Sequence, residues 1–438
     1  MNKPLITTAI FLLLFSIAFL AGQTGIPVED GGEFLTVARL GGTNHPPGLP
    51  LLSLSSRVSW ILFGREGLCV LFALFAALAL KLIKRKITVP IILFTAGILL
   101  LPFLTERLLA WDAYGPLFLI FAITLYRKPA IGLEAGYLMG LALAIHPQGI
   151  FLPVLFCWRK DSIPRFIGGL VLGCSLYLAL PICSASGAIV DWGNPGSIAN
   201  FLRQVTAGGY REVYGSSMGS LSINSIILHS GVLWKMLWPV LLIPAVIGTI
   251  RLFKENRELL LKLGILFIAD LLFVLIVNPM AAGTSQTATL SLLVVIVLSI
   301  IGISAIEKWR RSAGLLAAGA VLAAGVICWN PLPDQSEDII EYYAPAPLES
   351  IIFVSNNDLL YGGWVMKYVD DRRPDMVLLS TGNFSGWFER MATWFNPEVD
   401  LSRSVLEVGD YNMSREELAN RLINATIQDN PNRSVFTP

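Results

Sequence analysis

The sequence predicts a helical membrane protein with many spans and a small α/β domain at its C-terminal end. Of the 438 residues, 54% are hydrophobic and 14% are charged, whereas soluble domains carry about 25% charged residues. Apolar runs of membrane-spanning character recur up to residue 329. Beyond residue 330, short apolar runs alternate with amphipathic stretches, which is typical of parallel α/β folds. The net charge of +1 gives no indication of nucleic-acid binding.

The apolar segments are predicted to form eleven spans. The first resembles a signal peptide, but its apolar core is longer than a usual signal core, which favours an uncleaved span. A cleaved signal is the alternative. The predicted spans are 5–22, 67–83, 88–104, 114–126, 131–145, 147–158, 166–184, 233–250, 262–278, 285–304 and 312–329.

Lysine and arginine gather in alternate loops, and such loops are cytoplasmic by the positive-inside rule. The opposite loops hold fewer basic residues over longer stretches. The expected location is therefore the plasma membrane, with a cytoplasmic N-terminus and an external C-terminal part. The cytoplasmic set is Lys3, Lys81, Lys84, Arg85, Lys86, Arg127, Lys128, Arg159, Lys160, Arg165, Arg251, Lys254, Arg257, Lys262, Lys308, Arg310 and Arg311.

Residues 46–64 also look like a span, but counting them as one would place Lys81 and its basic neighbours outside. Arg57 and several serines lie within the run. The segment is therefore interpreted as a helix at the outer membrane surface, with Trp60 at headgroup level. A true second span is the alternative.

The predicted organisation is a transmembrane domain over 1–329 and an extracytoplasmic α/β domain over 330–438. The transmembrane part has a first external loop at 23–66 and a long external loop at 185–232. Loops of the latter length are usually functional or disordered. In the C-terminal domain, strands are predicted at 351–355, 376–380 and 433–437, and helices at 358–371, 386–395 and 414–428.

Five cysteines lie in or beside apolar runs without a CxxC pair, so neither a disulfide framework nor a zinc site is expected. P-loop and Ser-His-Asp patterns are absent from the sequence, and so is a DxD pair that would bind a nucleotide-sugar through a metal. No metal ligand is assigned. No cofactor is expected beyond a lipid-linked substrate.

Residues 27–50 concentrate polar groups that the apolar chain otherwise avoids, including Glu29, Asp30, Glu33 and His45. Polar groups near a bilayer are costly unless a site uses them. A carboxylate at a Gly-rich turn can approach a substrate hydroxyl and take its proton. Asp30 is therefore the leading catalytic candidate. The alternative for the carboxylates is an acidic external loop whose charge only follows from the membrane topology and has no catalytic role. The alternative for His45 is a structural role.

Further candidates lie near other external ends of the predicted spans. If a helix begins at Gly32, Glu33 and Arg39 project toward water or the site. Asp112 and Tyr114 lie where a span begins, so Asp112 is either a second acidic group of the site or a helix N-cap. His146 precedes a proline at another external turn, where a solvated turn is the alternative.

Several blocks, in order, resemble the bacterial relatives of the eukaryotic transmembrane O-mannosyltransferase that modifies plexin-type IPT domains. The blocks are EDGGEFLTVARLGGTNHPPGLPLL (29–52), AWDAYGPL (110–117), GLALAIHPQ (140–148), DWGNPGSIANFLRQVTAGGY (191–210) and SNNDLLYGGWVMKYVDDRRPDM (355–376). They are distributed over residues 29–376, which is most of the length of the chain. The resemblance departs from the family pattern at Asp112, where the family has Glu, and at Gly209, where a basic residue is usual.

This resemblance implies a GT-C glycosyltransferase that uses a polyprenyl-phosphate-linked sugar, with protein O-mannosylation as one such reaction. Asp30 would deprotonate an acceptor hydroxyl of a protein or glycan, with inversion at the sugar. Glu33, His45 and Asp112 would shape the site. Candidates to bind the donor or its phosphate are Arg39, His45, Tyr114, His146, Trp192, Arg203, Tyr210 and Arg211.

Two other function classes remain open from the sequence. A solute transporter or lipid-carrier flippase would place charges in the middle of spans, whereas the carboxylates considered above are expected at external ends. A non-catalytic assembly or binding protein would use the C-terminal domain as its working part.

Overall fold

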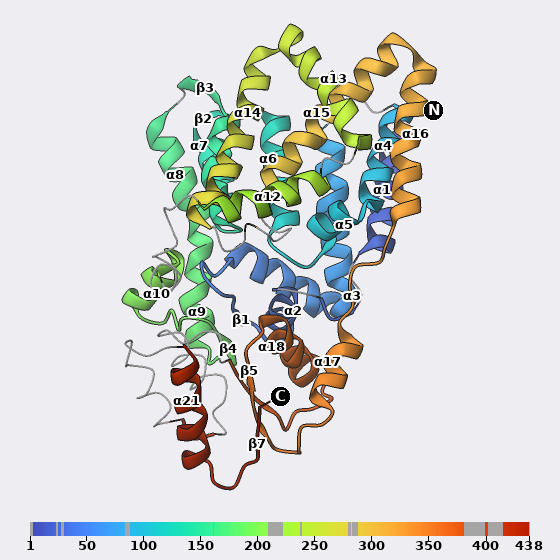
Figure 1. The fold of residues 1–438 in the computed structure, drawn as a ribbon. Coiled ribbons are helices and arrows are strands. Elements are labelled where there is room, and N and C mark those ends of the chain that lie inside the picture. Colours follow the sequence, from blue (N-terminus) through green and yellow to red (C-terminus); the bar gives the residue numbers. More distant parts are fainter. Residues whose placement is uncertain are drawn as a thin grey trace. The chain divides into compact units, whose positions relative to one another are not determined.

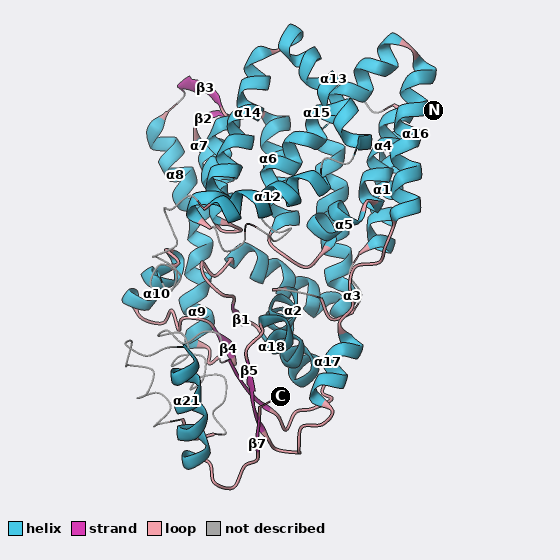
Figure 2. Cartoon of the chain, viewed as in Figure 1, coloured by secondary structure: helices cyan, strands magenta, loops and turns pink. Residues whose placement is uncertain are grey.

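The computed structural model describes residues 3–22, 25–27, 30–83, 88–160, 162–208, 222–236, 239–278, 282, 288–380, 399–401 and 415–437. Within them the chain is mostly helical (Figures 1 and 2). Contacts divide it into two units. The helical unit is Met1–Gln23, Cys69–Ser175 and Ser216–Leu332, and the loop unit is Thr24–Leu68, Leu176–Gly215 and Pro333–Pro438.

The helical unit contains most of the apolar helices. Its elements are α1 (Lys3–Ala21), α4 (Val89–Leu100), α5 (Pro102–Leu109), α6 (Tyr114–Arg127), β2 (Ala130–Ile131), α7 (Leu133–Leu143), η1 (Pro147–Leu155), β3 (Cys157–Lys160), α8 (Ile163–Cys174), α12 (Ile223–Met236), α13 (Pro239–Glu255), α14 (Arg257–Leu272), η3 (Phe273–Val277), α15 (Thr289–Trp309) and α16 (Arg311–Cys328).

Small residues bring pairs of these helices close together, as is common in membranes. A Cβ on Gly97 of α4 would lie 2.6 Å from the backbone nitrogen of Leu322 in α16. A Cβ on Gly302 of α15 would lie 1.8 Å from the carbonyl oxygen of Pro244 in α13. Helix pairs of this kind therefore depend on glycine at the contact.

Five described helices are long and apolar enough to cross a membrane, or six if the bent pair α12 and α13 forms one span. The five are Pro50–Ile83, Ile163–Ala185, Arg257–Val277, Thr289–Trp309 and Arg311–Cys328. Shorter apolar helices cover Thr8–Ala21, Val89–Leu100, Tyr114–Arg127 and Leu133–Leu143. These helices support membrane character, while the number of eleven spans stays a prediction.

The predicted span at 147–158 is wrong as a single membrane-crossing α-helix. Residues Pro147–Leu155 form the 3₁₀ helix η1, which contains Pro153, and β3 follows it. A nine-residue 3₁₀ helix rises only about 18 Å, which is short of the roughly 30 Å of a bilayer core. Proline, which lacks a backbone N–H, accounts for the lost α-helical pairing.

The segment at 46–64 becomes part of a longer helix. Helix α3 covers Pro50–Ile83 and is interrupted at Gly64, whose φ of 65° is outside the helical range. The predicted surface helix and the predicted span at 67–83 thus meet at this glycine. Near the break, Ile61, Leu62 and Phe63 are exposed, as expected of side chains that face lipid.

The loop unit joins three separate stretches of the chain. Its remaining elements are α2 (Gly31–Leu40), β1 (Gly42–Thr43), η2 (Ser175–Leu178), which begins one residue before the unit, α9 (Ala179–Ala185), β4 (Val190–Asp191), α10 (Ile198–Val205), α17 (Ser336–Tyr343), β5 (Ile351–Val354), α18 (Asn357–Trp364), η6 (Val365–Val369), β6 (Val377–Ser380), α21 (Arg415–Asp429) and β7 (Val435–Phe436). The predicted boundary at 329/330 stays a prediction.

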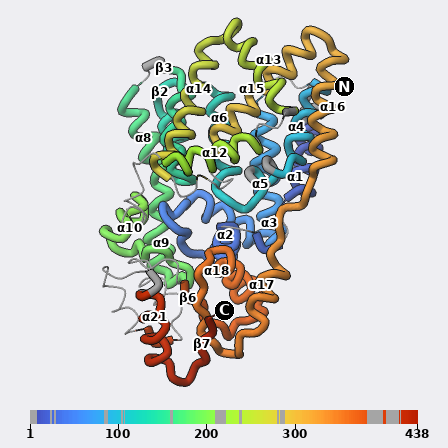
Figure 3. Tube along the Cα trace, viewed as in Figure 1, coloured from blue at the N-terminus to red at the C-terminus, as the bar shows by residue number. Residues whose placement is uncertain are grey.

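Three strands near the C-terminus form a parallel sheet in the order β6-β5-β7. Ile351 pairs with Val377 on one side and with Val435 on the other. Strands β5 and β6 are buried throughout, which suits a parallel sheet covered on both faces. The strands lie where the sequence predicts them. Figure 3 traces α21 into β7 at the red end of the chain.

The predicted C-terminal helices have different outcomes. The predicted helix at 358–371 is α18 followed by the π-helical turn η6, and that at 414–428 is α21. The predicted helix at 386–395 lies outside the described residues. Helix α17 was missed, because residues 336–343 directly follow a proline-containing linker.

Candidate functional site

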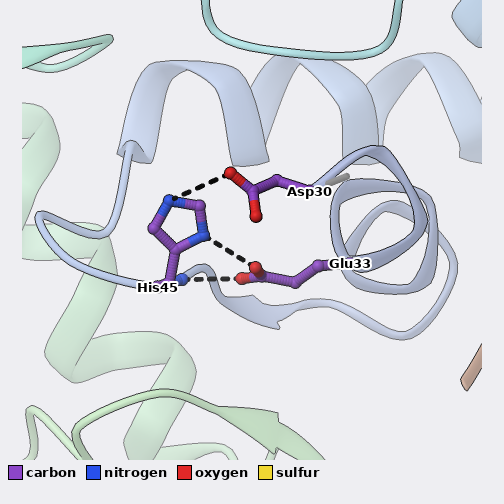
Figure 4. A group of neighbouring side chains, drawn as sticks. All are labelled: Asp30, Glu33 and His45. Carbon is purple, nitrogen blue, oxygen red and sulfur yellow. Dashed lines mark hydrogen bonds and ion pairs between the residues drawn. The ribbon is translucent and has the colours of Figure 1, made fainter. Parts of the chain in front are cut away.

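Asp30, Glu33 and His45 meet in the loop unit, as Figure 4 shows. The imidazole Nδ1 of His45 lies 2.7 Å from Glu33 Oε2, and its Nε2 lies 3.9 Å from Asp30 Oδ2. The backbone N–H of His45 also donates to Glu33 Oε1 at 2.6 Å. The ring therefore lies between two carboxylates from one turn of chain.

Burial differs sharply across this cluster. The Glu33 side chain is fully buried, His45 is 13% exposed, and Asp30 is 29% exposed. Desolvation raises the pKa of the Glu33 carboxyl, while its interactions with His45 act in the opposite direction. Since a carboxylate only accepts hydrogen bonds, Glu33 favours the tautomer of His45 with the proton on Nδ1. Asp30 is the member that a substrate can reach.

Helix α2 sets the spacing of the two carboxylates. Asp30 is the N-cap residue, yet its side chain forms no cap hydrogen bond, so the carboxylate is directed to the cluster. Glu33 follows three residues later, on the same side of the helix. A Cβ on Gly32 would lie 3.0 Å from the backbone of Tyr361, so this glycine lets α18 pack against the first turn of α2.

A short parallel strand pair holds the chain just before His45. Thr43 in β1 pairs with Asp191 in β4, and its hydroxyl donates to the Asp191 carboxylate at 3.0 Å. The Ser184 hydroxyl donates to the other oxygen at 2.6 Å. Burial raises the pKa of Asp191, and both hydroxyl bonds oppose that rise. Asp191 was not among the sequence candidates, although it directly precedes the candidate Trp192 in the block at 191–210.

Trp192 packs against the cluster, while its predicted role in binding the donor stays a prediction. Its ring is 2% exposed, and its centroid lies 6.3 Å from that of His45 in an edge-on arrangement. Phe34 lies on the ring at 5.6 Å. These aromatic groups limit the orientations that the imidazole can adopt.

Arg39 is engaged with the C-terminal stretch of the same unit. Its guanidinium pairs with Asp371 at 2.9 Å and donates to the carbonyl of Val369. Arg203 lies half-buried in the last turn of α10. Tyr210 and Arg211 lie outside the described residues, so the roles assigned to these groups stay predictions.

The other three candidates belong to the helical unit. Asp112 accepts a hydrogen bond from the backbone N–H of Ala113, directly before α6. The Tyr114 ring lies 5.3 Å from that of His146, which also faces Phe273 at 6.3 Å. Nδ1 of His146 accepts the backbone N–H of Gln148 at 3.3 Å, so this histidine caps η1.

Asp270, a carboxylate within a candidate span, was not among the sequence candidates. It is fully buried within the candidate span Arg257–Val277. Gln148 Nε2 donates to one carboxylate oxygen at 2.8 Å, and the Ser291 N–H donates to the other at 2.8 Å. Asp270 thus caps the first turn of α15 from a neighbouring helix. A single Asp inside an apolar run was a visible signal.

The arrangement around His45 can bind and move a proton or bind a cation. Each of Asp30, Glu33 and His45 offers one ligand atom, and these atoms lie within 4.8 Å of one another. No metal site was predicted here from the sequence, because the three positions do not follow a known ligand spacing. They come together when the 41–48 turn folds back on α2.

No protein-family model matches the chain. No curated protein matches it either. Among solved structures the chain is similar to the Archaeoglobus fulgidus oligosaccharyltransferase in its apo form, with 12% identity, a TM-score of 0.47, and coverage of 98% of this chain and 72% of that one.

Two further structures of the same archaeal enzyme are similar. The complex with zinc and sulfate has 13% identity, a TM-score of 0.41, and coverage of 89% and 69% of the two chains. The form tethered to an acceptor peptide has 11% identity, a TM-score of 0.41, and coverage of 90% and 68%. All three TM-scores are below 0.5, so we argue neither fold nor activity from them.

Proposed function

We propose that the chain is a membrane glycosyltransferase that moves a sugar from a polyprenyl-phosphate carrier to an acceptor hydroxyl. The observation that carries the proposal is the cluster in which a partly exposed Asp30 lies beside a His45 held by buried Glu33. The apolar helices suit a lipid-linked donor. The ordered blocks that resemble GT-C O-mannosyltransferases support the same reaction class.

Asp30 acts as the general base. Its carboxylate takes the proton of the acceptor hydroxyl, whose oxygen forms a bond to the anomeric carbon. The bond from that carbon to the carrier phosphate breaks, and polyprenyl phosphate leaves with the electron pair. Attack from the opposite face inverts the anomeric carbon. A positioned base typically contributes about 10²- to 10⁴-fold to the rate.

Other residues are proposed to bind and orient the substrates. Glu33 fixes the imidazole, and Trp192 packs beside it. Arg203 and the tyrosine and arginine at 210 and 211 are proposed to bind the carrier phosphate, since guanidinium groups suit phosphate oxygens. Asp112, Tyr114 and His146 remain proposed contributors, as does Arg39. The acceptor is a protein serine or threonine, or a glycan.

The reaction is proposed to occur outside the plasma membrane, in a protein with a cytoplasmic N-terminus. The asymmetry of lysine and arginine supports this orientation. An impermeant thiol reagent added to intact cells should label Glu337→Cys, which introduces a thiol at an exposed position of α17, above the background of the five native cysteines. Labelling of this position only after cell lysis would contradict the topology.

Purified protein in detergent should transfer label from a polyprenyl-phosphate hexose to an acceptor, and not from a nucleotide hexose. Nuclear magnetic resonance of the product should show the anomeric configuration opposite to that of the donor. Retention of configuration would contradict a single displacement with Asp30 as base. Transfer from the nucleotide-sugar alone would contradict the lipid-linked donor.

Transport of a solute or lipid carrier is the second candidate, and the buried Asp270 favours it. Both carboxylate oxygens receive protein hydrogen bonds, which also suits a purely structural cap. An assay in proteoliposomes distinguishes transport from glycosyl transfer. Transport would be favoured if the wild type moves the carrier but transfers no sugar, and if Asp270→Asn no longer moves the carrier.

A further inference from the structure

A fixed imidazole between two carboxylates is an arrangement that metal sites use. Histidines that bind a metal through one ring nitrogen usually donate the other ring N–H to a carboxylate, which orients the ring and raises its basicity. Glu33 holds the Nδ1 side of His45 in this way at 2.7 Å. The backbone N–H of His45 anchors the same carboxylate at 2.6 Å, so the ring and its partner form one rigid piece.

The opposite ring nitrogen faces the second carboxylate at a suitable distance. His45 Nε2 and Asp30 Oδ2 are 3.9 Å apart. Metal bonds to imidazole nitrogen and carboxylate oxygen are about 2.1 Å long, so one ion can bind both atoms when they lie up to about 4.2 Å apart. The observed separation is within that reach without a change of backbone.

The charge of the cluster also favours a cation. Two carboxylates share a single imidazole, and one of them is completely buried. Nearby basic groups of the loop unit have other partners: Arg39 pairs with Asp371, and Arg65 pairs with Asp370. The positive end of α2 offsets part of the negative charge, but it does so with only about half an elementary charge.

We propose that Asp30 and His45 bind one divalent cation through Oδ2 and Nε2, with Glu33 as the carboxylate that orients the imidazole. Mixed oxygen and nitrogen ligands suit Mn²⁺ or Zn²⁺. Two protein ligands leave several positions for water or for an oxygen-rich anionic substrate such as a phosphate.

The proposed binding of the cation does not rest on the proposed function. The proposal that a substrate phosphate also binds the cation does rest on it. A cation at Asp30 Oδ2 leaves the second oxygen of that carboxylate for the acceptor hydroxyl. It would also offset the charge of the departing carrier phosphate. The cation then links the base and the donor within one site.

Mn²⁺ is the probe for the test, because electron paramagnetic resonance distinguishes free from bound ions. The 438-residue chain is used without a histidine tag. The imidazoles of a tag would bind Mn²⁺ themselves and would mask the signal from the three histidines of the chain. We expect one Mn²⁺ per chain with a dissociation constant below about 1 mM. The spin echo of the bound ion should carry nitrogen modulation from one imidazole.

Three variants test the assignment, and the Asp30 and His45 variants each have a matched control. Asp30→Asn should abolish stoichiometric binding, whereas Asp338→Asn, at an exposed carboxylate of α17, should bind as the wild type does. His45→Gln should remove the nitrogen modulation, whereas His146→Gln should retain it. Glu33→Gln should weaken binding by about 10- to 100-fold, as loss of an orienting carboxylate does.

Circular dichroism and elution volume confirm that each variant is folded. Equal Mn²⁺ binding by the wild type and Asp30→Asn would overturn the inference. Binding without nitrogen modulation in the wild type would also overturn it, as would no binding by folded wild type. Sugar transfer that proceeds at full rate in excess chelator would reject the role of the cation in the reaction while leaving the proposed transferase intact.

Discussion

Two histidines in this chain precede a proline at a turn, and the fold uses them differently. The His45 ring lies between Glu33 and Asp30 in the loop unit. The His146 ring lies among Tyr114 and Phe273 in the helical unit, and its Nδ1 accepts the N–H of Gln148. Both imidazoles thus lie against aromatic rings, but that of His45 also contacts two carboxylates, whereas that of His146 caps η1.

This difference shows that the His-Pro dipeptide does not determine the chemistry of the ring. Proline restricts the turn in both cases. What decides is the partner that the chain brings back to the ring. For His45 that partner is Glu33, which lies in the first turn of α2 twelve positions earlier. For His146 the partner is the backbone N–H of Gln148, two positions later.

The largest effect on stability is expected at Glu33. Replacing it with Ala leaves two N–H groups of His45 without their acceptor inside a buried site. An unsatisfied buried donor costs about 1–3 kcal/mol, so we expect a loss of roughly 3 kcal/mol in the free energy of unfolding. Glu33→Gln retains one acceptor and should lose less. Equal thermal stability of Glu33→Ala and wild type would mean that the hydrogen bonds between His45 and Glu33 do not stabilise the fold.

Asp191 tests whether the strand pair before His45 supports the cluster. Asp191→Ala removes one acceptor from each of the Thr43 and Ser184 hydroxyls, which keep the Trp192 carbonyl and Asn194 Oδ1 as alternatives. We therefore expect a loss of about 1 kcal/mol in the free energy of unfolding. Asp191→Asn keeps an acceptor and removes a buried charge, so its unfolding temperature should stay close to that of the wild type. An Asn variant as unstable as the Ala variant would contradict this account.

His146 should show the smaller effect of a helix cap. His146→Ala removes the side-chain acceptor at the start of η1 and should cost about 1 kcal/mol. His146→Asn supplies a favoured cap side chain and should recover part of that loss in a thermal unfolding assay. A loss as large as that of Glu33→Ala would indicate that the two histidines are more alike than their contacts suggest.

The smallest effect concerns the surface ion pair of Arg373 and Asp375, separated by 2.9 Å. Hydrogen bonds from Arg373 lower the pKa of Asp375 from 3.8 to about 2. A depressed carboxyl pKa stabilises the fold above the unfolded pKa, and the contribution disappears as pH falls from about 4 to about 2.

Solvent screening limits this contribution to about 1 kcal/mol. The difference in unfolding temperature between wild type and Asp375→Asn should therefore shrink between pH 5 and pH 2.5. A difference that is constant across this range would mean that the ion pair contributes nothing to stability.

The sequence predicts the apolar helices and C-terminal strands well, because their cause is local. Burial on both faces makes residues 351–354 and 377–380 continuous apolar runs. Proline at 153, by contrast, made 147–158 an unsuitable span, and hydropathy takes no account of that proline.

The candidate site was predictable in part. Asp30, Glu33 and His45 stand out as polar residues in one apolar region, but their mutual distances depend on a turn and a strand pair formed with residues 190–191. Asp191 was missed because its partner Thr43 is far away in sequence, whereas Asp270 was visible as a single Asp in an apolar run and was not considered. Pattern reasoning finds unusual residues, whereas the pairing of such residues follows from tertiary packing.

The central claim is that Asp30 is the reacting carboxylate, and the transfer rate of Asp30→Asn tests it most directly. With saturating polyprenyl-phosphate sugar, this variant should be slower than wild type by at least about 100-fold. Asp338→Asn, the same chemical change at an exposed position of α17, should transfer at the wild-type rate. Equal transfer by folded Asp30→Asn and wild type would contradict the claim.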